Sequence, residues 1–201
     1  MSTIRNICVY CGSGPGTDTR FVTAATAFGA ILADNDIGLV YGGGSVGLMG
    51  AAAAATLAKG GRVTGIIPEF LSNRERPFSD AQELIVTRDM HERKRIMFER
   101  SDAFVALPGG VGTLEELVEQ LTWAQLGRHK KPILAANIGG FWDPLCALLD
   151  HMQRLAFIRP GLSVTLLVAD KVEDILPKLF EAARSLPEAE KLMESGAAER
   201  M

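Results

Sequence analysis

Short apolar runs rich in β-branched residues alternate along this chain with longer segments whose apolar residues recur at helical spacing. The runs predict strands at 7–10, 37–41, 63–67, 83–87, 103–107, 132–136 and 163–168. The helical patterns predict helices at 21–32, 48–58, 89–99, 113–126, 142–155 and 172–185. Such alternation, with nearly continuous apolar strands, is typical of a mostly parallel sheet covered by helices on both faces. The sequence therefore predicts a single-domain, doubly wound, Rossmann-like α/β fold.

Length and composition fit one globular domain. We expect this domain to span residues 1–186 and residues 187–201 to form a frayed tail. The 201 residues are 47% hydrophobic with a formal net charge of −3, which gives no support for nucleic-acid binding. Three cysteines are too few for a disulfide framework, and no apolar run is long enough to span a bilayer. We expect a cytoplasmic protein with reduced cysteines and no membrane partner.

Glycine-rich turns follow three of the predicted strands, at 12–16, 42–47 and 108–112. In a doubly wound sheet, ligands bind at the carboxyl ends of the strands, near the point where the strand order reverses. We therefore expect the functional site among these turns. The connection at 68–81 is long and polar, which indicates either a lid or a mobile loop, with the lid favoured.

The segment 108–116, Pro-Gly-Gly-Val-Gly-Thr-Leu-Glu-Glu, joins a predicted strand to a predicted helix. Glycines let the backbone approach a ligand closely, and unpaired N–H groups at a helix N-terminus favour a phosphate or carboxylate. The alternative is a capping box, in which Thr113 and Glu116 satisfy each other's backbone N–H groups. The glycines and Pro108 favour the anion site, because a cap does not need them.

The turn at 42–47 matches the spacing of the dinucleotide-binding fingerprint, and Glu69 lies near the distance expected for a ribose-binding acid. The match follows the second strand rather than the first, so a tightly packed strand-to-helix turn is an alternative. We interpret Gly43 and Gly44 as contacts to the phosphate or sugar of a nucleotide.

The helix predicted at 89–99 places Met90, Arg93 and Met97 near one face. An arginine there is either a surface residue or a planar donor directed at a site. The run 91–95 lacks the second histidine of a zinc-protease motif, and no other spacing predicts a metal site. The sequence also lacks a Gly-x-Ser-x-Gly elbow and a Walker lysine, which disfavours an esterase and a P-loop NTPase.

The groups that remain as candidates for chemistry are an anion-binding turn, an arginine–lysine pair and one or two carboxylates. This set suits cleavage of the N-glycosidic bond of a nucleotide. The ribose becomes oxocarbenium-like as the base departs, and a carboxylate near the anomeric carbon stabilises this charge and orients or deprotonates water. Cationic donors hold the 5′-phosphate or assist the leaving base.

Three motifs in this order resemble the LOG family of cytokinin riboside 5′-monophosphate phosphoribohydrolases. They are Gly-Gly-Gly-x-x-Gly-Leu-Met-Gly at 42–50, Met-His-x-Arg-Lys at 90–94 and Pro-Gly-Gly-x-Gly-Thr-x-x-Glu at 108–116. The resemblance runs from about residue 7 to residue 168. It implies hydrolysis of an N6-substituted adenosine 5′-monophosphate, or of AMP, to free base and ribose 5-phosphate. It also implies a homodimer and no cofactor.

The resemblance further implies roles for single residues. Arg93 and Glu116 match the catalytic arginine and glutamate of the family, and Met90 would lie against the base. Further matches to substrate-binding positions are Glu75, Lys94, Gly109, Gly110, Gly112, Thr113, Glu115 and Thr122.

Two other functions stay open at this point. One is a non-catalytic carrier of a nucleotide or cofactor on the same fold, although a carrier has little need of both Arg93 and Glu116. The other is a dinucleotide-dependent oxidoreductase that uses the turn at 42–47. The sequence does not choose between N6-modified AMP, AMP and another monophosphate as the physiological substrate.

Overall fold

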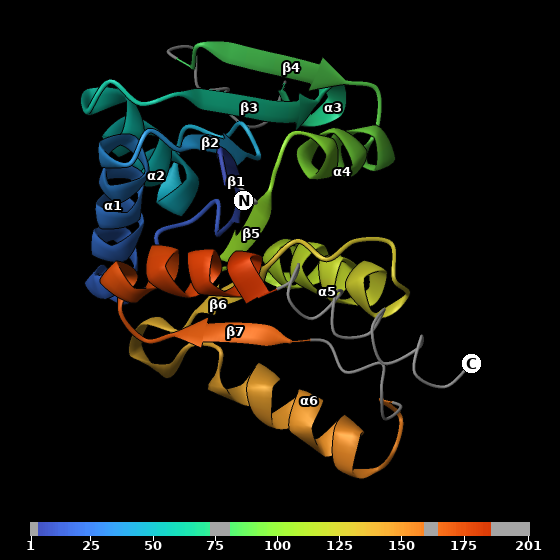
Figure 1. The fold of residues 1–201 in the computed structure, drawn as a ribbon. Coiled ribbons are helices and arrows are strands. Elements are labelled where there is room, and N and C mark those ends of the chain that lie inside the picture. Colours follow the sequence, from blue (N-terminus) through green and yellow to red (C-terminus); the bar gives the residue numbers. More distant parts are fainter. Residues whose placement is uncertain (1–3, 73–80, 159–164, 186–201) are drawn as a thin grey trace.

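The computed structural model describes residues 4–72, 81–158 and 165–185. In this part of the chain, one sheet of seven strands has the order β4-β3-β2-β1-β5-β6-β7, and all neighbouring strands are parallel (Figure 1). The strands are β1 (Asn6–Tyr10), β2 (Gly38–Tyr41), β3 (Val63–Pro68), β4 (Glu83–Thr87), β5 (Ala103–Ala106), β6 (Ile133–Ala136) and β7 (Leu166–Ala169). The central strands are buried on both faces, which explains their continuous apolar sequences.

Helices cover both faces of the sheet (Figure 1). They are α1 (Thr19–Asp34), α2 (Gly47–Ala58), α3 (Glu69–Ser72), α4 (Met90–Glu99), α5 (Val111–Gln125), α6 (Asp143–Arg154), the 3-10 turns η1 (Ile138–Gly140) and η2 (Val172–Asp174), and the helical residues 175–185. One face of the sheet shares a core with α1, α2 and residues 175–185, and the other with α4, α5 and α6. The predicted doubly wound, Rossmann-like fold is confirmed.

The strand order reverses between β1 and β5. The chain moves outward from β1 to β4 and then returns to place β5 on the other side of β1, where Ile7 lies opposite Ala103. The turns that follow β1 and β5 are therefore neighbours, and the N–H of Gly12 donates to the carbonyl of Pro108 at 3.0 Å. Rossmann-like sheets bind ligands at such a reversal, so two of the three glycine turns lie where the sequence predicted a site.

Most predicted elements agree closely with the observed ones. The helix predicted at 172–185 differs in starting with the single turn η2. The predicted tail at 187–201 lies outside the described residues, as do parts of the predicted lid at 68–81 and of the strand predicted at 163–168. The assignment of residues 1–186 to one domain stays a prediction.

Candidate functional site

A cavity of about 310 Å³ opens where the turns after β1 and β5 meet. It is lined by residues 12–16 and 108–110, and by the apolar residues Phe21, Leu48 and Phe141. Gly109 is required here, because a Cβ atom would lie 2.9 Å from the Gly12 nitrogen and closer still to the side chain of the nearby Thr113. The glycine therefore allows the two turns to approach each other.

Helix α5 begins beside this cavity without a side-chain cap. Gly110 is the N-cap, and Thr113 lies inside the first turn with its side chain buried. The capping box considered for Thr113 and Glu116 is therefore wrong, because the helix starts at Val111. A Cβ atom at Gly110 or Gly112 would meet nothing within 4 Å, so the first turn is open to a ligand. Uncapped N–H groups and the helix dipole make it suited to an anion.

Arg93 reaches from α4 to the carboxyl ends of the strands and is only 7% exposed. Its Nε donates to the carbonyl of Ile66 at 3.0 Å, and its Nη2 donates to the carbonyl of Gly42 at 3.4 Å. Its Nη1 lies 3.8 Å from the sulfur of Met90 and 3.5 Å from Oε1 of Glu116. The arginine is thus a buried donor that faces Glu116, rather than a surface residue. Backbone carbonyls of β3 and of the turn after β2 hold its guanidinium in place.

The glycines at 42–47 are explained by close packing. A Cβ atom at Gly42 would lie 2.2 Å from Nη2 of Arg93, and one at Gly47 would lie 2.3 Å from the carbonyl oxygen of Ser13. Gly43 and Gly47 also have positive φ angles of 79° and 63°. The turn therefore makes room for the arginine and for the turn after β1. Gly43 and its neighbour Gly44 are buried there, so the tightly packed turn considered from the sequence accounts for much of this motif.

Glu116 faces Arg93 from the second turn of α5 and is 8% exposed. Burial raises the pKa of this carboxyl from its ordinary 4.5 to about 7, although the positive charge of Arg93 acts in the opposite direction. The negative charge of Glu115 adds to the increase. A carboxyl with a pKa near neutrality can both accept and return a proton, which is the property of a general acid–base group.

Lys94 lies next to this pair, between two carboxylates of α5. Its Nζ is 2.6 Å from Oε1 of Glu115 and 2.8 Å from Oε2 of Glu119. Glu119 is absent from the predicted site, although its spacing of four residues from Glu115 places both on neighbouring turns of one helix. The backbone carbonyls of Ile66 and Gly42 are likewise partners of Arg93 that no side-chain motif could identify.

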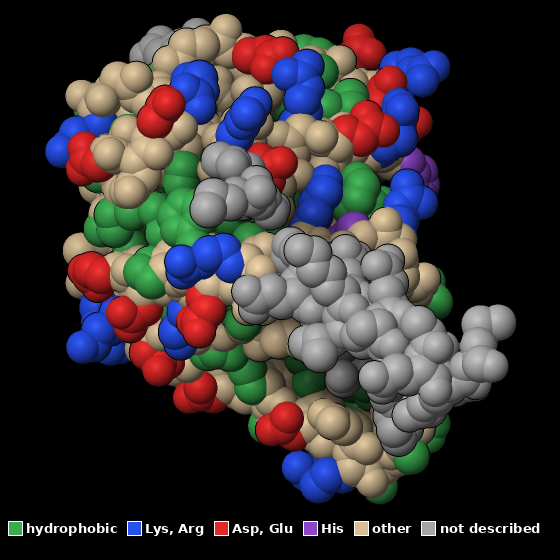
Figure 2. Space-filling view, in the orientation of Figure 1, with side chains coloured by type: hydrophobic (Ala, Val, Ile, Leu, Met, Phe, Trp, Pro, Cys, Tyr) green, Lys and Arg blue, Asp and Glu red, His purple; other side chains and the backbone are tan. Residues whose placement is uncertain are grey.

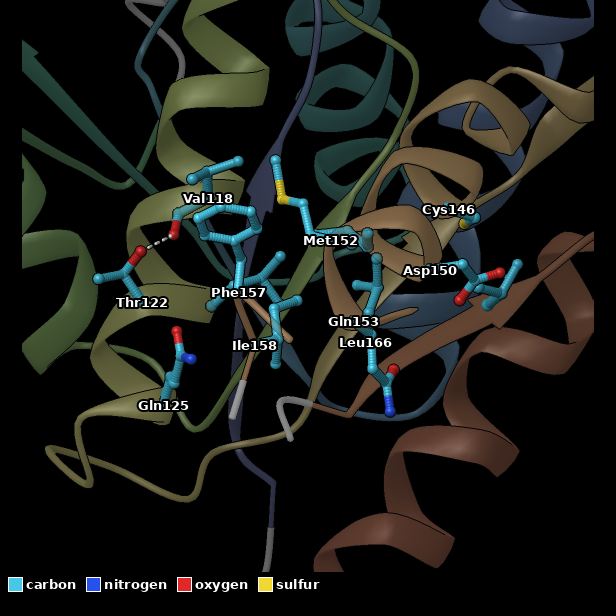
Figure 3. A pocket seen from close by; sticks show the side chains of 13 residues that line it. Val118, Thr122, Gln125, Cys146, Asp150, Met152, Gln153, Phe157, Ile158 and Leu166 are labelled. Atoms are coloured by element: carbon cyan, nitrogen blue, oxygen red, sulfur yellow. Dashed lines mark hydrogen bonds between the residues drawn. The ribbon is translucent and has the colours of Figure 1, made fainter. Parts of the chain in front are cut away.

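Thr122 lies in a different depression from the other predicted residues. A groove of about 440 Å³ between α5 and α6 is lined by Val118 and Thr122 on one helix and by Met152 and Phe157 on the other side (Figure 3). Within it, the hydroxyl of Thr122 donates to the carbonyl of Val118 at 2.8 Å. The predicted contact Glu75 lies outside the described residues.

The remaining chemical expectations concern metals, membranes and nucleic acid. In residues 4–72, 81–158 and 165–185, no three His, Cys, Asp or Glu side chains are arranged to hold a metal ion. Within the same ranges, no helix combines the length and the apolar character of a membrane span. Acidic and basic side chains are interspersed over the face shown in Figure 2. Cys8 and Cys11 are buried as free thiols.

Fold and site together define a Rossmann-like α/β protein with a buried arginine–glutamate pair beside an open helix N-terminus at the strand reversal. The family model described as "Possible lysine decarboxylase" matches residues 49–179. LOG3 of Arabidopsis thaliana, named as a cytokinin riboside 5′-monophosphate phosphoribohydrolase, is 43% identical over 90% of this chain and 85% of its own length. LOG of Oryza sativa subsp. japonica, with the same name, is 44% identical over 90% and 74%. The chain belongs to the LOG family.

Solved structures of proteins with a different named function share the fold. A molybdenum cofactor binding protein from Rippkaea orientalis aligns with a TM-score of 0.67 and 24% identity, over 90% of this chain and 98% of its own. The molybdenum cofactor carrier protein of Chlamydomonas reinhardtii aligns with the same TM-score at 22% identity, over the same shares. At these identities the likeness shows a common fold.

Proposed function

We infer that this chain hydrolyses the N-glycosidic bond of a cytokinin riboside 5′-monophosphate, or of a closely related adenosine 5′-monophosphate, to free base and ribose 5-phosphate. The observation that carries this proposal is the buried pair of Arg93 and Glu116 beside the uncapped start of α5. The names of relatives more than 40% identical over most of the chain support the same reaction.

The substrate would lie along the first turns of α5. Its phosphate would be held by the open N-terminus at Gly110–Thr113, where N–H groups and the helix dipole favour an anion. An α-helix rises about 1.5 Å per residue, so Glu116 lies about 7.5 Å along the axis from Val111. This distance leaves room for a ribose ring between the phosphate and the carboxylate. Gly109, Gly110, Gly112 and Thr113 thus belong to the phosphate end of the proposed site.

Glu116 would act on the sugar. Its carboxylate stabilises the positive charge that develops at C1′ as the bond to the base breaks, and it accepts a proton from the attacking water. The water oxygen bonds to C1′, the electron pair of the broken bond leaves with the base, and the proton passes from Glu116 to the base. A carboxyl pKa of about 7 suits both proton transfers near neutral pH.

Arg93 would orient these groups. Because Ile66 and Gly42 fix its guanidinium, the arginine can donate to the sugar or the base without reorganising during the reaction. Met90 contacts the same guanidinium and offers an apolar surface to the base. Lys94 and Glu115 border the site as further polar contacts, and Gly43 and Gly44 shape it from the turn after β2.

A homodimer in the cytoplasm is part of the same proposal. Large exposed apolar side chains lie on α5 and along the groove between α5 and α6, among them Val111, Val118, Met152 and Phe157. A second copy of the chain covering this face would remove the apolar surface from water. It would also bring the partner near Thr122, which explains how that residue could serve as a substrate contact from the groove.

The test is product formation by three proteins: wild type, Glu116→Gln and the surface variant Glu99→Gln. Each is incubated with AMP and with N6-isopentenyl-AMP, and free base is detected by chromatography while nucleotide binding is measured by calorimetry. We expect release by wild type and Glu99→Gln, and binding without release by Glu116→Gln. Binding without release by all three would favour the carrier instead.

A further inference from the structure

Lys94 is held by two carboxylates that differ in their surroundings. The Lys94 side chain is 12% exposed, and its partners Glu119 and Glu115 are 21% and 51% exposed. Exposed ion pairs contribute little, because water screens them and the side chains stay mobile. The less exposed Glu119 is therefore the partner that fixes the ammonium group.

Within the part of the chain that the structure describes, the second oxygen of Glu119 has no hydrogen-bond partner. Oε1 of this carboxylate is buried and accepts no hydrogen bond from the described residues. A buried polar atom left unpaired is unfavourable for stability. Among the described residues, the contact that the Glu119 carboxylate makes is therefore the ion pair of its other oxygen with Lys94.

Glu116 is the group that this arrangement affects. On α5 its neighbours are Glu115 and Glu119, whose negative charges raise its pKa, and on α4 they are Arg93 and Lys94, whose positive charges lower it. On the β1 side it faces Cys8, Tyr10 and Cys11, and burial raises the pKa of each of these three, so they stay neutral near pH 7. Burial is the main cause of the raised pKa of Glu116, and the charges of α4 and α5 then adjust this pKa in either direction.

A Lys94 side chain released from Glu119 would change the charges that surround Glu116. The lysine follows Arg93 on α4, and Arg93 already contacts Glu116 at 3.5 Å. Without Glu119, the flexible ammonium group keeps only the half-exposed Glu115 as a partner, and the buried carboxylate of Glu116 becomes the competing one. An ion pair between Lys94 and Glu116 would occupy the oxygens that the proposed reaction needs for water and sugar.

We propose that Glu119 is a positioning residue that holds Lys94 against Glu115 and so keeps the carboxylate of Glu116 free for the substrate. The effect of this positioning on the reaction rate rests on the proposed hydrolase function. The positioning itself is a property of the ligand-free protein, in which it can be measured separately.

The first measurement is the titration of Glu116 by carbon-13 NMR of the side-chain carboxyls in the ligand-free protein, with Glu116→Gln identifying the resonance. In Glu119→Gln, we expect the Glu116 pKa to fall by about one pH unit, the usual effect of one nearby charge. In the double variant Lys94→Met/Glu119→Gln, we expect it to return towards the wild-type value. An unchanged titration in Glu119→Gln, or a double variant that matches Glu119→Gln, would overturn the proposal.

The second measurement is the pH profile of hydrolysis. Glu119→Gln should lower kcat by about tenfold and move the acidic limb of kcat/KM to lower pH, whereas Glu99→Gln should leave both unchanged. A purely structural role would lower activity through unfolding without moving the limb, so a superimposable limb contradicts the proposal. If wild type hydrolyses no nucleotide, the proposed function fails, and the NMR titration still decides the role of Glu119.

Discussion

Replacing Glu116 by Gln should stabilise the protein above neutral pH while it removes activity. Folding raises the pKa of Glu116 from 4.5 to about 7, so the unfolded chain loses this proton first as pH rises. The stability associated with the protonated carboxyl is therefore complete below about pH 4.5 and is lost as the pH rises through about 7. At about 1.4 kcal/mol for each pKa unit, the loss is about 3 kcal/mol.

Glutamine resembles the protonated carboxyl in shape and can still accept from Arg93, but it never ionises. We therefore expect the stability of wild type to fall by about 2 to 3 kcal/mol more than that of Glu116→Gln between about pH 5 and pH 8. With an m-value of about 2 kcal/mol/M, the gap between their urea midpoints should widen by about 1 M. The assay is urea unfolding followed by circular dichroism at equal protein concentrations, because association would add to apparent stability.

The matched control is Glu99→Gln, at the end of α4. Its side chain is more than half exposed, so its ion pair with Arg95 contributes little and the urea midpoint should follow that of wild type at both pH values. A gap between Glu116→Gln and wild type that is the same at both pH values would refute the reasoning. It would mean that the folded protein does not oppose ionisation of Glu116.

Three further predictions concern the site and the groove. The kcat/KM of wild type should rise about tenfold per pH unit below pH 7 and level off above it, since the ionised form of Glu116 is required; a flat profile from about pH 5 to 8 would contradict this. Gly42→Ala should lower kcat by about a hundredfold without unfolding the protein, because its Cβ displaces the guanidinium of Arg93; unchanged kinetics would show that this placement is not needed. Val118→Glu should yield a monomer by sedimentation, whereas a dimer of unchanged affinity would place the interface elsewhere.

The fold was predictable because the apolar runs, the helical patterns and the glycine turns of the sequence all favour it. Buried parallel strands require continuous apolar runs, and glycine turns mark their carboxyl ends, so both the strand positions and the edge that carries the site follow from the pattern. Residues 108–116 also predict an anion site from chemistry alone. The start of α5 was predicted two residues too late, at residue 113. Thr113 with Glu116 has the spacing of a cap, and only the backbone shows that the helix begins at Val111, after the N-cap Gly110.

The site could be predicted only in part, because its partners come from distant segments. Spacing on α4 indicates that Arg93 shares a face with Met90, but not that the carbonyls of Ile66 and Gly42 anchor it. The 42–47 turn resembled a dinucleotide fingerprint, whereas the structure gives Gly42 and Gly47 packing reasons. Such reasons depend on side chains and backbone groups that lie far away in the sequence.

The most direct test of the account is the stoichiometry of products from N6-isopentenyl-AMP and AMP with wild-type protein, in buffer without added phosphate, metal or cofactor. We expect free base and ribose 5-phosphate to appear in equal amounts, with water as the only co-substrate. Nucleotide that binds but remains intact would contradict it and would leave a carrier on the same fold as the function.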